Sequence, residues 1–156
     1  MADQPDPDAL TVAPPFERAH VRMLAVLSLH TSPLVQPGSG DSGGMNVYVR
    51  ELVSSLAQAG VHSEVFVRRW HAELPDVVDV EPGFRVVHVD AGPPGLAKEQ
   101  LPDIVGAYTE GVARHLRRSG TTDAIHQPSS SFRTSQRVAR TARNRCRFAP
   151  GAGARG

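Results

Sequence analysis

Several residue types are scarce in this chain of 156 residues, and each scarcity excludes a class of protein. A single cysteine, Cys146, cannot form an internal disulfide bond or build a metal site alone, which favours a reducing compartment. No apolar run approaches the ~20 residues that a membrane-spanning helix needs. Residues 1–20 carry acids and prolines where a signal peptide has a basic start and an apolar centre. The sequence therefore predicts a cytoplasmic protein without a membrane partner.

Acidic residues and lysine are absent from residues 127–156, which hold seven arginines. Basic segments can bind nucleic acid, but this one has few aromatic residues and no recognisable motif, so no nucleic-acid partner is predicted. It also lacks strand periodicity, and only residues 137–145 could form a short basic helix. We interpret residues 127–156 as a disordered, Arg-rich tail.

Residues 21–126 show the alternation of strands and helices that is typical of an α/β fold with a parallel sheet. Buried strands are expected at residues 21–29, 61–69 and 84–90, and residues 123–126 look like the start of another. One helix is expected from Met45 to just before Gly60, and a second from Leu101 to Gly120, with a loop over residues 91–102. Residues 21–69 would form a β-α-β unit with a right-handed crossover.

The long polar loop in LSLHTSPLVQPGSGDSGGMNVYVREL, residues 27–52, is the strongest functional signal. In doubly wound sheets, ligands bind beyond the carboxyl ends of the strands, where this loop should lie. Gly43 and Gly44 would allow backbone to approach a ligand, and the first N–H groups of the helix would face an anion. His30 could donate a hydrogen bond to a hydroxyl or phosphate group, while Asp41 and Asn46 suit a polyhydroxylated compound.

Plainer interpretations of the same loop remain open. A Gly-Gly pair before a helix is often only a turn, Asp41 or Ser42 could simply cap the helix, and a lone loop histidine often has no special role. The loop matches neither the dinucleotide-binding nor the P-loop glycine pattern, so neither function is supported.

The segment HTSPLVQPGSGDSGGMNVYVRELVSSLAQAG, residues 30–60, closely resembles retaining glycosyltransferases of the GT-B fold and GT4 type. It is most similar to the D-inositol-3-phosphate glycosyltransferases, which use UDP-N-acetylglucosamine in mycothiol biosynthesis. The resemblance runs from about Val21 to His126 and includes KEQLP and EGVARHLRRSG. It implies a truncated N-terminal Rossmann-like domain at 21–126. The Pro- and Asp-rich residues 1–20 lack periodicity and are expected to form a flexible leader, and the disordered tail at 127–156 follows the domain.

The resemblance also implies roles for individual residues, with no metal ligand, no cofactor and no support for Mg²⁺. The implied donor-binding residues are His30, Gln36, Pro37 and Gly44. The implied acceptor-binding residues are Asp41, Ser42, Gly43, Gly44, Met45, Asn46 and Lys98. Lys98 is the only lysine of the chain, and its point charge suits the acceptor phosphate, although a solvated surface lysine is the plain alternative.

We therefore interpret the chain as the N-terminal fragment of an enzyme that transfers N-acetylglucosamine from UDP-N-acetylglucosamine to inositol phosphate. Sixteen of the seventeen basic residues are arginine, as GC-rich codons favour, so the tail suggests a frameshifted or truncated gene after about His126. Without a second domain the fragment is expected to be inactive. The alternatives are a stand-alone sugar-phosphate binding module and a fragment of another GT4-type enzyme, such as a sucrose-synthase-like one.

Overall fold

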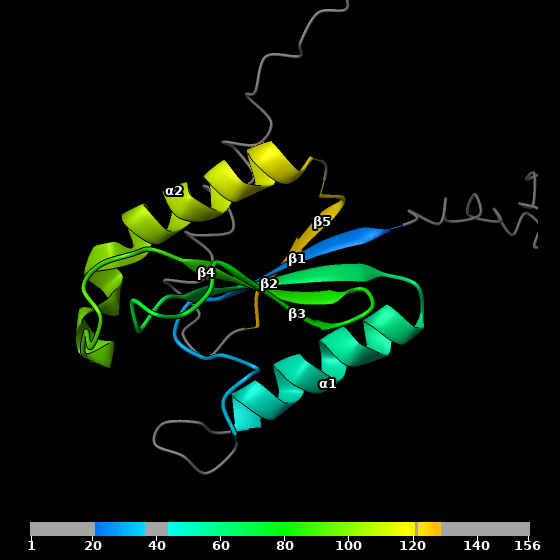
Figure 1. Ribbon diagram of the computed structural model, residues 1–156, viewed down its shortest axis with the longest axis horizontal. Coiled ribbons are helices and arrows are strands. Elements are labelled where there is room, and N and C mark those ends of the chain that lie inside the picture. Colours follow the sequence, from blue (N-terminus) through cyan, green and yellow to red (C-terminus); the bar gives the residue numbers. More distant parts are fainter. Residues whose placement is uncertain (1–20, 37–43, 121, 129–156) are drawn as a thin grey trace, which may run out of the picture.

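The computed structural model describes residues 21–36, 44–120 and 122–128. Within these residues, one five-stranded sheet lies between two helices (Figure 1). The strands are β1 (Met23–Ser28), β2 (His62–Arg68), β3 (Val77–Glu81), β4 (Phe84–Val89) and β5 (Ala124–His126). The helices are α1 (Gly44–Gln58), α2 (Leu101–Ser119) and the 3-10 turn η1 (Lys98–Gln100). The leader at 1–20 and the tail from 129 onward lie outside the described residues.

The sheet has the order β3-β4-β2-β1-β5 and is parallel except at one edge. β1 pairs in parallel with β2 and with β5, and β2 pairs in parallel with β4. The predicted α/β class and the β-α-β unit of β1, α1 and β2 are thus confirmed. Because β1, β2 and β4 run in the same direction, their carboxyl ends meet at one edge of the sheet.

Strand β3 was not predicted, since the sequence pattern indicates no strand between residues 69 and 84. It pairs antiparallel with β4 at the edge of the sheet, where Val78 and Val80 are half-buried and alternate with exposed residues. Gly83, with φ +86°, lies in the short connection between the two strands. A five-residue edge strand with two acidic residues gives too weak an apolar signal to stand out from a loop.

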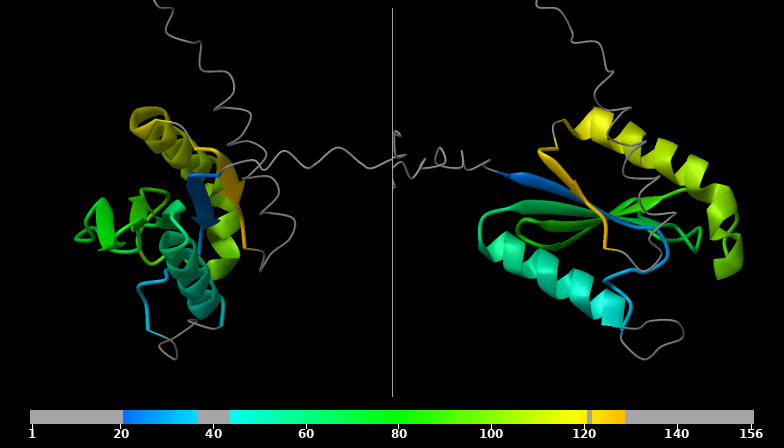
Figure 2. Two further views of the ribbon diagram at one scale, coloured as in Figure 1. Left: turned by 90° about the vertical axis from the view of Figure 1, so that its right-hand side faces the viewer. Right: turned by 180° about the vertical axis from the view of Figure 1, so that it is seen from behind.

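Each face of the sheet packs against one helix, and Figure 2 shows the resulting three layers edge-on. On the α1 face, Val49 and Val53 of the helix pack with Val26, Val65 and other strand residues. On the α2 face, the fully buried Tyr108 packs with Phe66, and its hydroxyl donates to the Phe66 carbonyl at 2.8 Å. Burial raises the pKa of the Tyr108 phenol, so it stays a neutral donor.

The ends of both helices are set by local signals that the sequence shows. After α1, Gly60 adopts φ +82°, and the N–H groups of Gly60 and Val61 donate to the carbonyls of Ala57 and Leu56. This is a Schellman cap, as the glycine predicted. Helix α2 begins at Leu101 as expected, but the preceding residues form the turn η1 and are not all loop.

Candidate functional site

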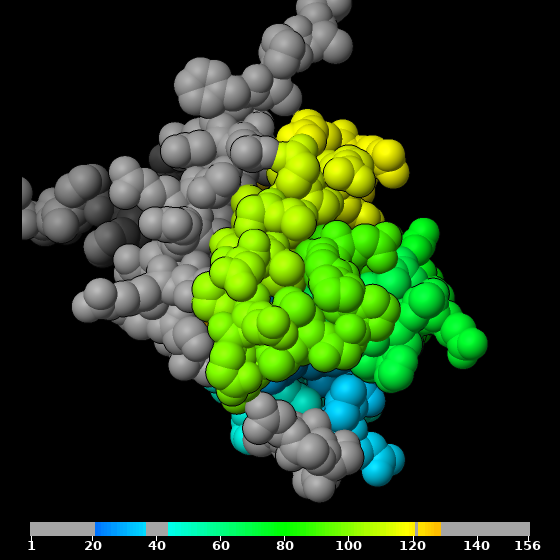
Figure 3. Space-filling model, turned by 90° about the vertical axis from the view of Figure 1, so that its left-hand side faces the viewer, coloured from blue at the N-terminus to red at the C-terminus, as the bar shows by residue number. Residues whose placement is uncertain are grey.

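A cavity of about 350 Å³ lies at the carboxyl end of the strands, where β1, α1, β2 and the connection from β4 to α2 meet. We call it the carboxyl-end cavity. Figure 3 views this side of the molecule, with the residues after β1 in blue next to green residues of later segments. Its lining residues are Leu29, His30, Thr31, Ser32, Val35, Asn46, Val67, Arg68, Trp70, Leu96, Lys98 and Leu101.

Hydrogen bonds hold the segment after β1 that carries His30. The Ser28 hydroxyl donates to the Thr31 carbonyl at 2.7 Å, which turns the chain sharply as the strand ends. The Leu34 N–H then donates to the buried Ser32 hydroxyl at 3.2 Å. His30 lies between these two contacts, exposed at the rim of the cavity. The HTSP block therefore supplies its own turn and positions the imidazole at the cavity.

Asn46 lies in the first turn of α1 and is only 3% exposed, although it lines the cavity. Its Oδ1 atom has no hydrogen-bond donor among the described residues. A buried amide oxygen without a donor costs about 1–3 kcal/mol. A hydroxyl group of a bound molecule would remove that cost, so Asn46 suits a polyol.

Lys98 begins the turn η1 and is exposed at the cavity. The turn is fixed by two hydrogen bonds between Ala97 and Gln100, one from each backbone N–H. Upstream, Gly92 lies so close to α2 that a Cβ atom there would be 2.6 Å from Ile104 Cγ2. The backbone that carries the ammonium group is thus held against the helix.

Two cavity residues at the end of β2, Arg68 and Trp70, were missed by the sequence reasoning. Arg68 is 8% exposed, and its Nη1 atom donates to the Pro93 carbonyl at 2.8 Å. Burial lowers the pKa of the Arg68 guanidinium, and no carboxylate among the described residues offsets the effect. The signal in the sequence was an arginine directly after the apolar residues VFV (65–67), at the strand's carboxyl end.

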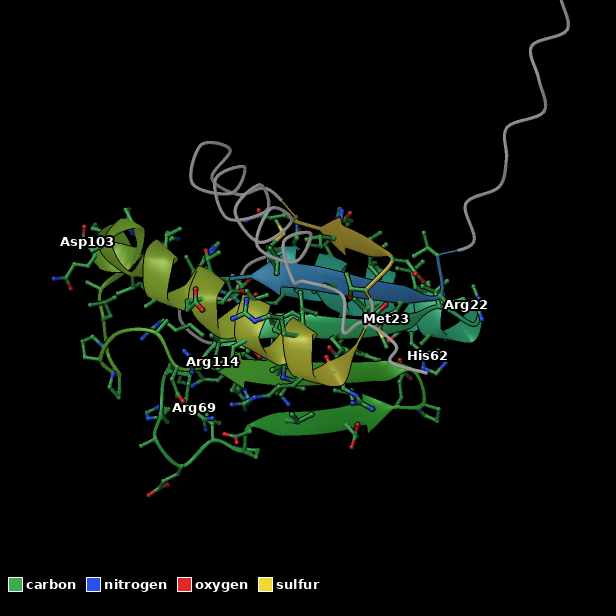
Figure 4. The ribbon with its side chains drawn as sticks, turned by 90° about the horizontal axis from the view of Figure 1, so that it is seen from above. Arg22, Met23, His62, Arg69, Asp103 and Arg114 are labelled. Atoms are coloured by element: carbon green, nitrogen blue, oxygen red, sulfur yellow. The ribbon has the colours of Figure 1, made fainter. Side chains whose placement is uncertain are left out.

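The adjacent Arg69 anchors the segment that contains Trp70. Its guanidinium bonds Asp76, Asp90 and the Leu74 carbonyl, with an Nε–Oδ1 distance of 2.6 Å to Asp90. Burial alone would lower the pKa of Arg69, but the two carboxylates outweigh it and raise that pKa. Figure 4 shows Arg69 at the opposite end of the sheet from His62. Arg69 is therefore a structural cation with two carboxylate partners, whereas no carboxylate partner is found for Arg68 among the described residues.

Trp70 is also held from the side of β4. Its ring meets that of His88 edge to face, with centroids 5.5 Å apart. The buried His88 bonds the Pro75 carbonyl through Nδ1 at 2.6 Å, so the ring N–H there is the donor. An anchored indole at the rim of the cavity offers a flat apolar surface to a sugar ring.

The lining of the carboxyl-end cavity includes two cations, Arg68 and Lys98, and no Asp or Glu among the described residues. The cavity thus combines two cationic side chains with hydrogen-bonding side chains and a few apolar walls. Such a lining suits a small anion that carries hydroxyl groups, a phosphorylated polyol above all.

The structure brings three of the predicted site residues together in this cavity, namely His30, Asn46 and Lys98. Gln36 and Gly44 are exposed and are not among the lining residues, while Met45 packs against the α1-side core. Pro37, Asp41, Ser42 and Gly43 lie outside the described residues. The individual binding roles of all these residues stay predictions.

Two other features are absent from residues 21–36, 44–120 and 122–128. No three His, Cys, Asp or Glu side chains in those ranges converge on a point that could hold a metal ion. Neither of the described helices combines the length and the apolar character that crossing a bilayer requires.

Comparison with known proteins places the chain among glycosyltransferases. The D-inositol 3-phosphate glycosyltransferase of Kineococcus radiotolerans is 55% identical over 111 residues, which cover 68% of this chain and 25% of that protein. The protein of the same description from Xylanimonas cellulosilytica is 53% identical over 106 residues, covering 66% of this chain and 25% of that protein. The chain therefore spans about a quarter of the length of these curated relatives.

A solved structure supports the same assignment. Sucrose-phosphate synthase from Thermosynechococcus elongatus superposes with a TM-score of 0.71 at 29% identity, covering 79% of this chain and 30% of that one. The family described as glycosyl transferase 4-like domain matches residues 43–150, which extends past His126, where the resemblance noted in the sequence ends. With this match over most of its length, the chain belongs to the glycosyl transferase 4-like domain family.

Proposed function

We propose that this chain forms the acceptor-binding part of a glycosyltransferase that transfers N-acetylglucosamine from UDP-N-acetylglucosamine to inositol phosphate. The observation that carries the proposal is the carboxyl-end cavity, which has two cations, a buried amide oxygen without a donor among the described residues, and no described carboxylate. The names of the relatives support inositol 3-phosphate as the acceptor class.

The proposed binding mode follows from the chemistry of the lining. The acceptor phosphate lies against the cationic side of the cavity, because a phosphate dianion gains charge-assisted hydrogen bonds there. Ring hydroxyls donate to Asn46 Oδ1 and interact with His30 at the rim. The apolar faces of the ring contact Trp70 and Leu96. Such an arrangement would fix which hydroxyl points out of the cavity.

Transfer with retention of configuration requires that this hydroxyl be held against the anomeric carbon of the donor while the leaving diphosphate gains charge. Orientation and preorganised electrostatics supply much of the rate of such reactions. The N–H groups at the start of α1 would face the donor diphosphate. We propose that the 156-residue polypeptide by itself binds the acceptor but does not catalyse transfer, because these relatives contain about four times the length of the matched region.

Titration of the purified chain with myo-inositol 3-phosphate tests the acceptor site. In ¹H–¹⁵N NMR spectra, we expect saturable shifts for the amides of Asn46, Lys98 and Leu96 and for the Asn46 side-chain amide. Unphosphorylated myo-inositol should bind at least about tenfold more weakly, since one charge-assisted contact is worth about 1.5–3 kcal/mol. A folded chain whose spectrum does not change at millimolar inositol phosphate would contradict the proposal.

A second acceptor class is favoured by the structural likeness to sucrose-phosphate synthase. A hexose phosphate also combines a ring, hydroxyl groups and a phosphate, and it would use the same two cations. Competition between myo-inositol 3-phosphate and hexose phosphates for the same amide shifts decides between them. Tighter binding of a hexose phosphate would replace inositol phosphate as the acceptor while leaving the cavity as the acceptor site.

A further inference from the structure

We propose that Arg68 is a second phosphate-binding cation of the carboxyl-end cavity, acting with Lys98, and that it selects phosphorylated over unphosphorylated acceptors. The proposal rests on the proposed function and names a residue that the sequence reasoning did not identify. It concerns which groups hold the phosphate and so adds to the acceptor site described above.

The first argument is the electrostatic environment of the guanidinium. Arg68 is 8% exposed, yet no ion pair with a carboxylate is found for it among the described residues, and burial depresses its pKa. A buried charge is costly unless it is paired. The neighbouring Arg69, in contrast, has two carboxylate partners and a carbonyl. An anion in the cavity would give Arg68 the counter-charge that Arg69 already has.

The second argument is the hydrogen-bonding capacity of the side chain. A guanidinium carries five N–H donors in a planar fork. The hydrogen bond found for Arg68 in the described part of the chain is the one from Nη1 to the Pro93 carbonyl, at 2.8 Å. That bond ties the guanidinium, which lines the cavity, to the connection between β4 and η1 that leads to Lys98. The remaining donors match two oxygens of a phosphate group, which a lysine ammonium cannot do in the same geometry.

The third argument is the distribution of charge around the cavity. Arg68 comes from the end of β2 and Lys98 from the turn η1, so two separate segments contribute one cation each to the same lining. A dianion can be shared by both cations, whereas a hydroxyl group gains little from either. Selectivity for a phosphorylated acceptor therefore follows from the pair.

The test compares Arg68→Gln and Arg68→Lys with Arg114→Gln, which removes the same charge from an exposed site on α2 (Figure 4). Calorimetry and NMR titration of the full 156-residue chain would give dissociation constants for myo-inositol 3-phosphate and for myo-inositol. We expect Arg68→Gln to bind the phosphate ester about 10- to 100-fold more weakly, with myo-inositol unchanged. The dissociation constant of Arg68→Lys for the phosphate ester should lie between those of the original chain and of Arg68→Gln. That of Arg114→Gln should remain within about twofold of the original chain.

Two outcomes would overturn the inference. Equal binding of the phosphate ester by Arg68→Gln and the original chain would show that the guanidinium does not touch phosphate. If Arg68→Gln bound both ligands more weakly by the same factor, the role of Arg68 would be structural only, through its hydrogen bond to Pro93. If Arg68→Gln fails to fold, the side-chain Nε–Hε resonance of Arg68 in the original chain decides, since it must shift on addition of inorganic phosphate.

The same measurements distinguish failure of the acceptor assignment from failure of the role proposed for Arg68. If inorganic phosphate shifts the Arg68 Nε–Hε resonance but no polyol phosphate binds more tightly than phosphate itself, Arg68 is an anion-binding residue and the acceptor assignment is wrong. If inositol phosphate binds and that resonance does not respond, the acceptor assignment stands and the role of Arg68 is rejected.

Discussion

The sheet has a cavity at each end. Both cavities are large enough for a small ligand, but they differ in the charge of their lining residues. The carboxyl-end cavity has about 350 Å³, while the amino-end cavity, lined by Glu64, Asp79, Glu81, His62, Arg85 and neighbouring residues, has about 530 Å³. The larger of the two contains three acidic side chains and lies where strands begin. Volume alone would therefore indicate the wrong end of the molecule for an anionic ligand.

The charges of the amino-end cavity are largely matched within the protein. Arg85 lies 3.5 Å from Asp79 and 3.6 Å from Glu64, and the other Glu64 oxygen is 3.3 Å from His115 Nε2. At the carboxyl end, Arg68 has no such carboxylate in the described ranges. An anion-binding site needs a cation that is not already paired with a carboxylate, and among the described residues of these two cavities Arg68 of the carboxyl-end cavity meets that requirement.

The topology of the chain explains the asymmetry. Parallel strands bring their carboxyl ends together, and there the chain continues into the long loop before α1 and the connection before α2. At the amino ends the turns are short, as at Gly60 and Gly83, and leave little room for variation. Ligand-binding residues therefore accumulate at the carboxyl edge, as is general for open α/β sheets.

The strongest test of the charge difference is to place a carboxylate in the carboxyl-end cavity. Asn46→Asp should weaken the binding of inositol phosphate by about 100-fold or more. The new carboxylate repels the phosphate and pairs with the cavity cations. The fold should tolerate it, since an acidic residue in the first turn of α1 interacts favourably with the helix dipole. Calorimetric titration measures the effect, and Arg85→Gln at the amino-end cavity serves as control. Undiminished binding by Asn46→Asp would remove the charge argument.

A smaller loss is expected when one cation of the cavity is removed. Lys98→Gln should weaken the binding of inositol phosphate about 10- to 100-fold. It should also reduce the dependence of binding on salt concentration, because one ion contact with the phosphate is lost. Titrations at low and moderate ionic strength measure both quantities. Lys98 is exposed, so the melting temperature should hardly change. A parallel loss for myo-inositol would indicate damage to the cavity rather than to the phosphate contact.

Sequence patterns predicted the elements whose buried residues are either periodic, as in a helix, or continuous, as in a central strand. Val49 and Val53, four residues apart, are both buried on one face of α1, and the apolar runs at residues 21–29 and 61–69 are the central strands β1 and β2. Such elements are specified locally, because one face or both faces must be apolar. Strand β3 is half-exposed and paired on one side only, and its identity depends on the partner β4.

Of the residues that line the cavity, the sequence predicted His30 and Asn46, around the first loop, and Lys98. His30 and Asn46 are near each other in sequence, so their loop could be examined as one unit. Arg68 and Trp70 reach the cavity through the register of β2 in the sheet, and the burial of an arginine cannot be read from its position beside a second arginine. Long-range packing, and not local propensity, decides which of two adjacent arginines faces a ligand and which one anchors a loop.

A pair of glycines in α2 tests how closely this helix packs on β4. A Cβ atom at Gly111 would lie 2.3 Å from Val89 Cγ1, so Gly111→Ala should destabilise the fold by about 1–3 kcal/mol through overpacking. Gly106 has open space at the same position, and Gly106→Ala should stabilise α2 by up to about 1 kcal/mol through helix propensity. Urea unfolding measures both changes. An unchanged or raised stability of Gly111→Ala would contradict the close packing of α2 on β4.

The smallest expected effect is a pH dependence confined to the amino end of the sheet. Asp123 Oδ2 accepts hydrogen bonds from the N–H groups of Arg22, at 2.7 Å, and Met23, at 3.0 Å, which joins the starts of β1 and β5. These two bonds lower the pKa of the Asp123 carboxyl in the folded chain. Its contribution to stability is thus complete above the unfolded pKa, about 4, and is lost as the pH falls through the lower folded value.

Asp123→Asn should therefore be less stable than the original chain at pH 7, and the difference should shrink as the pH is lowered from about 4 to 2. Thermal unfolding at several pH values measures this difference, and Glu73→Gln, at an exposed position in the segment before β3, is the matched control. Binding of inositol phosphate at pH 7 should not change, because Asp123 lies at the end of the sheet away from the carboxyl-end cavity. If the stability difference between Asp123→Asn and the original chain were constant across the whole pH range, the carboxylate charge would not hold the strands together. A change in binding would show that the two ends of the sheet are coupled.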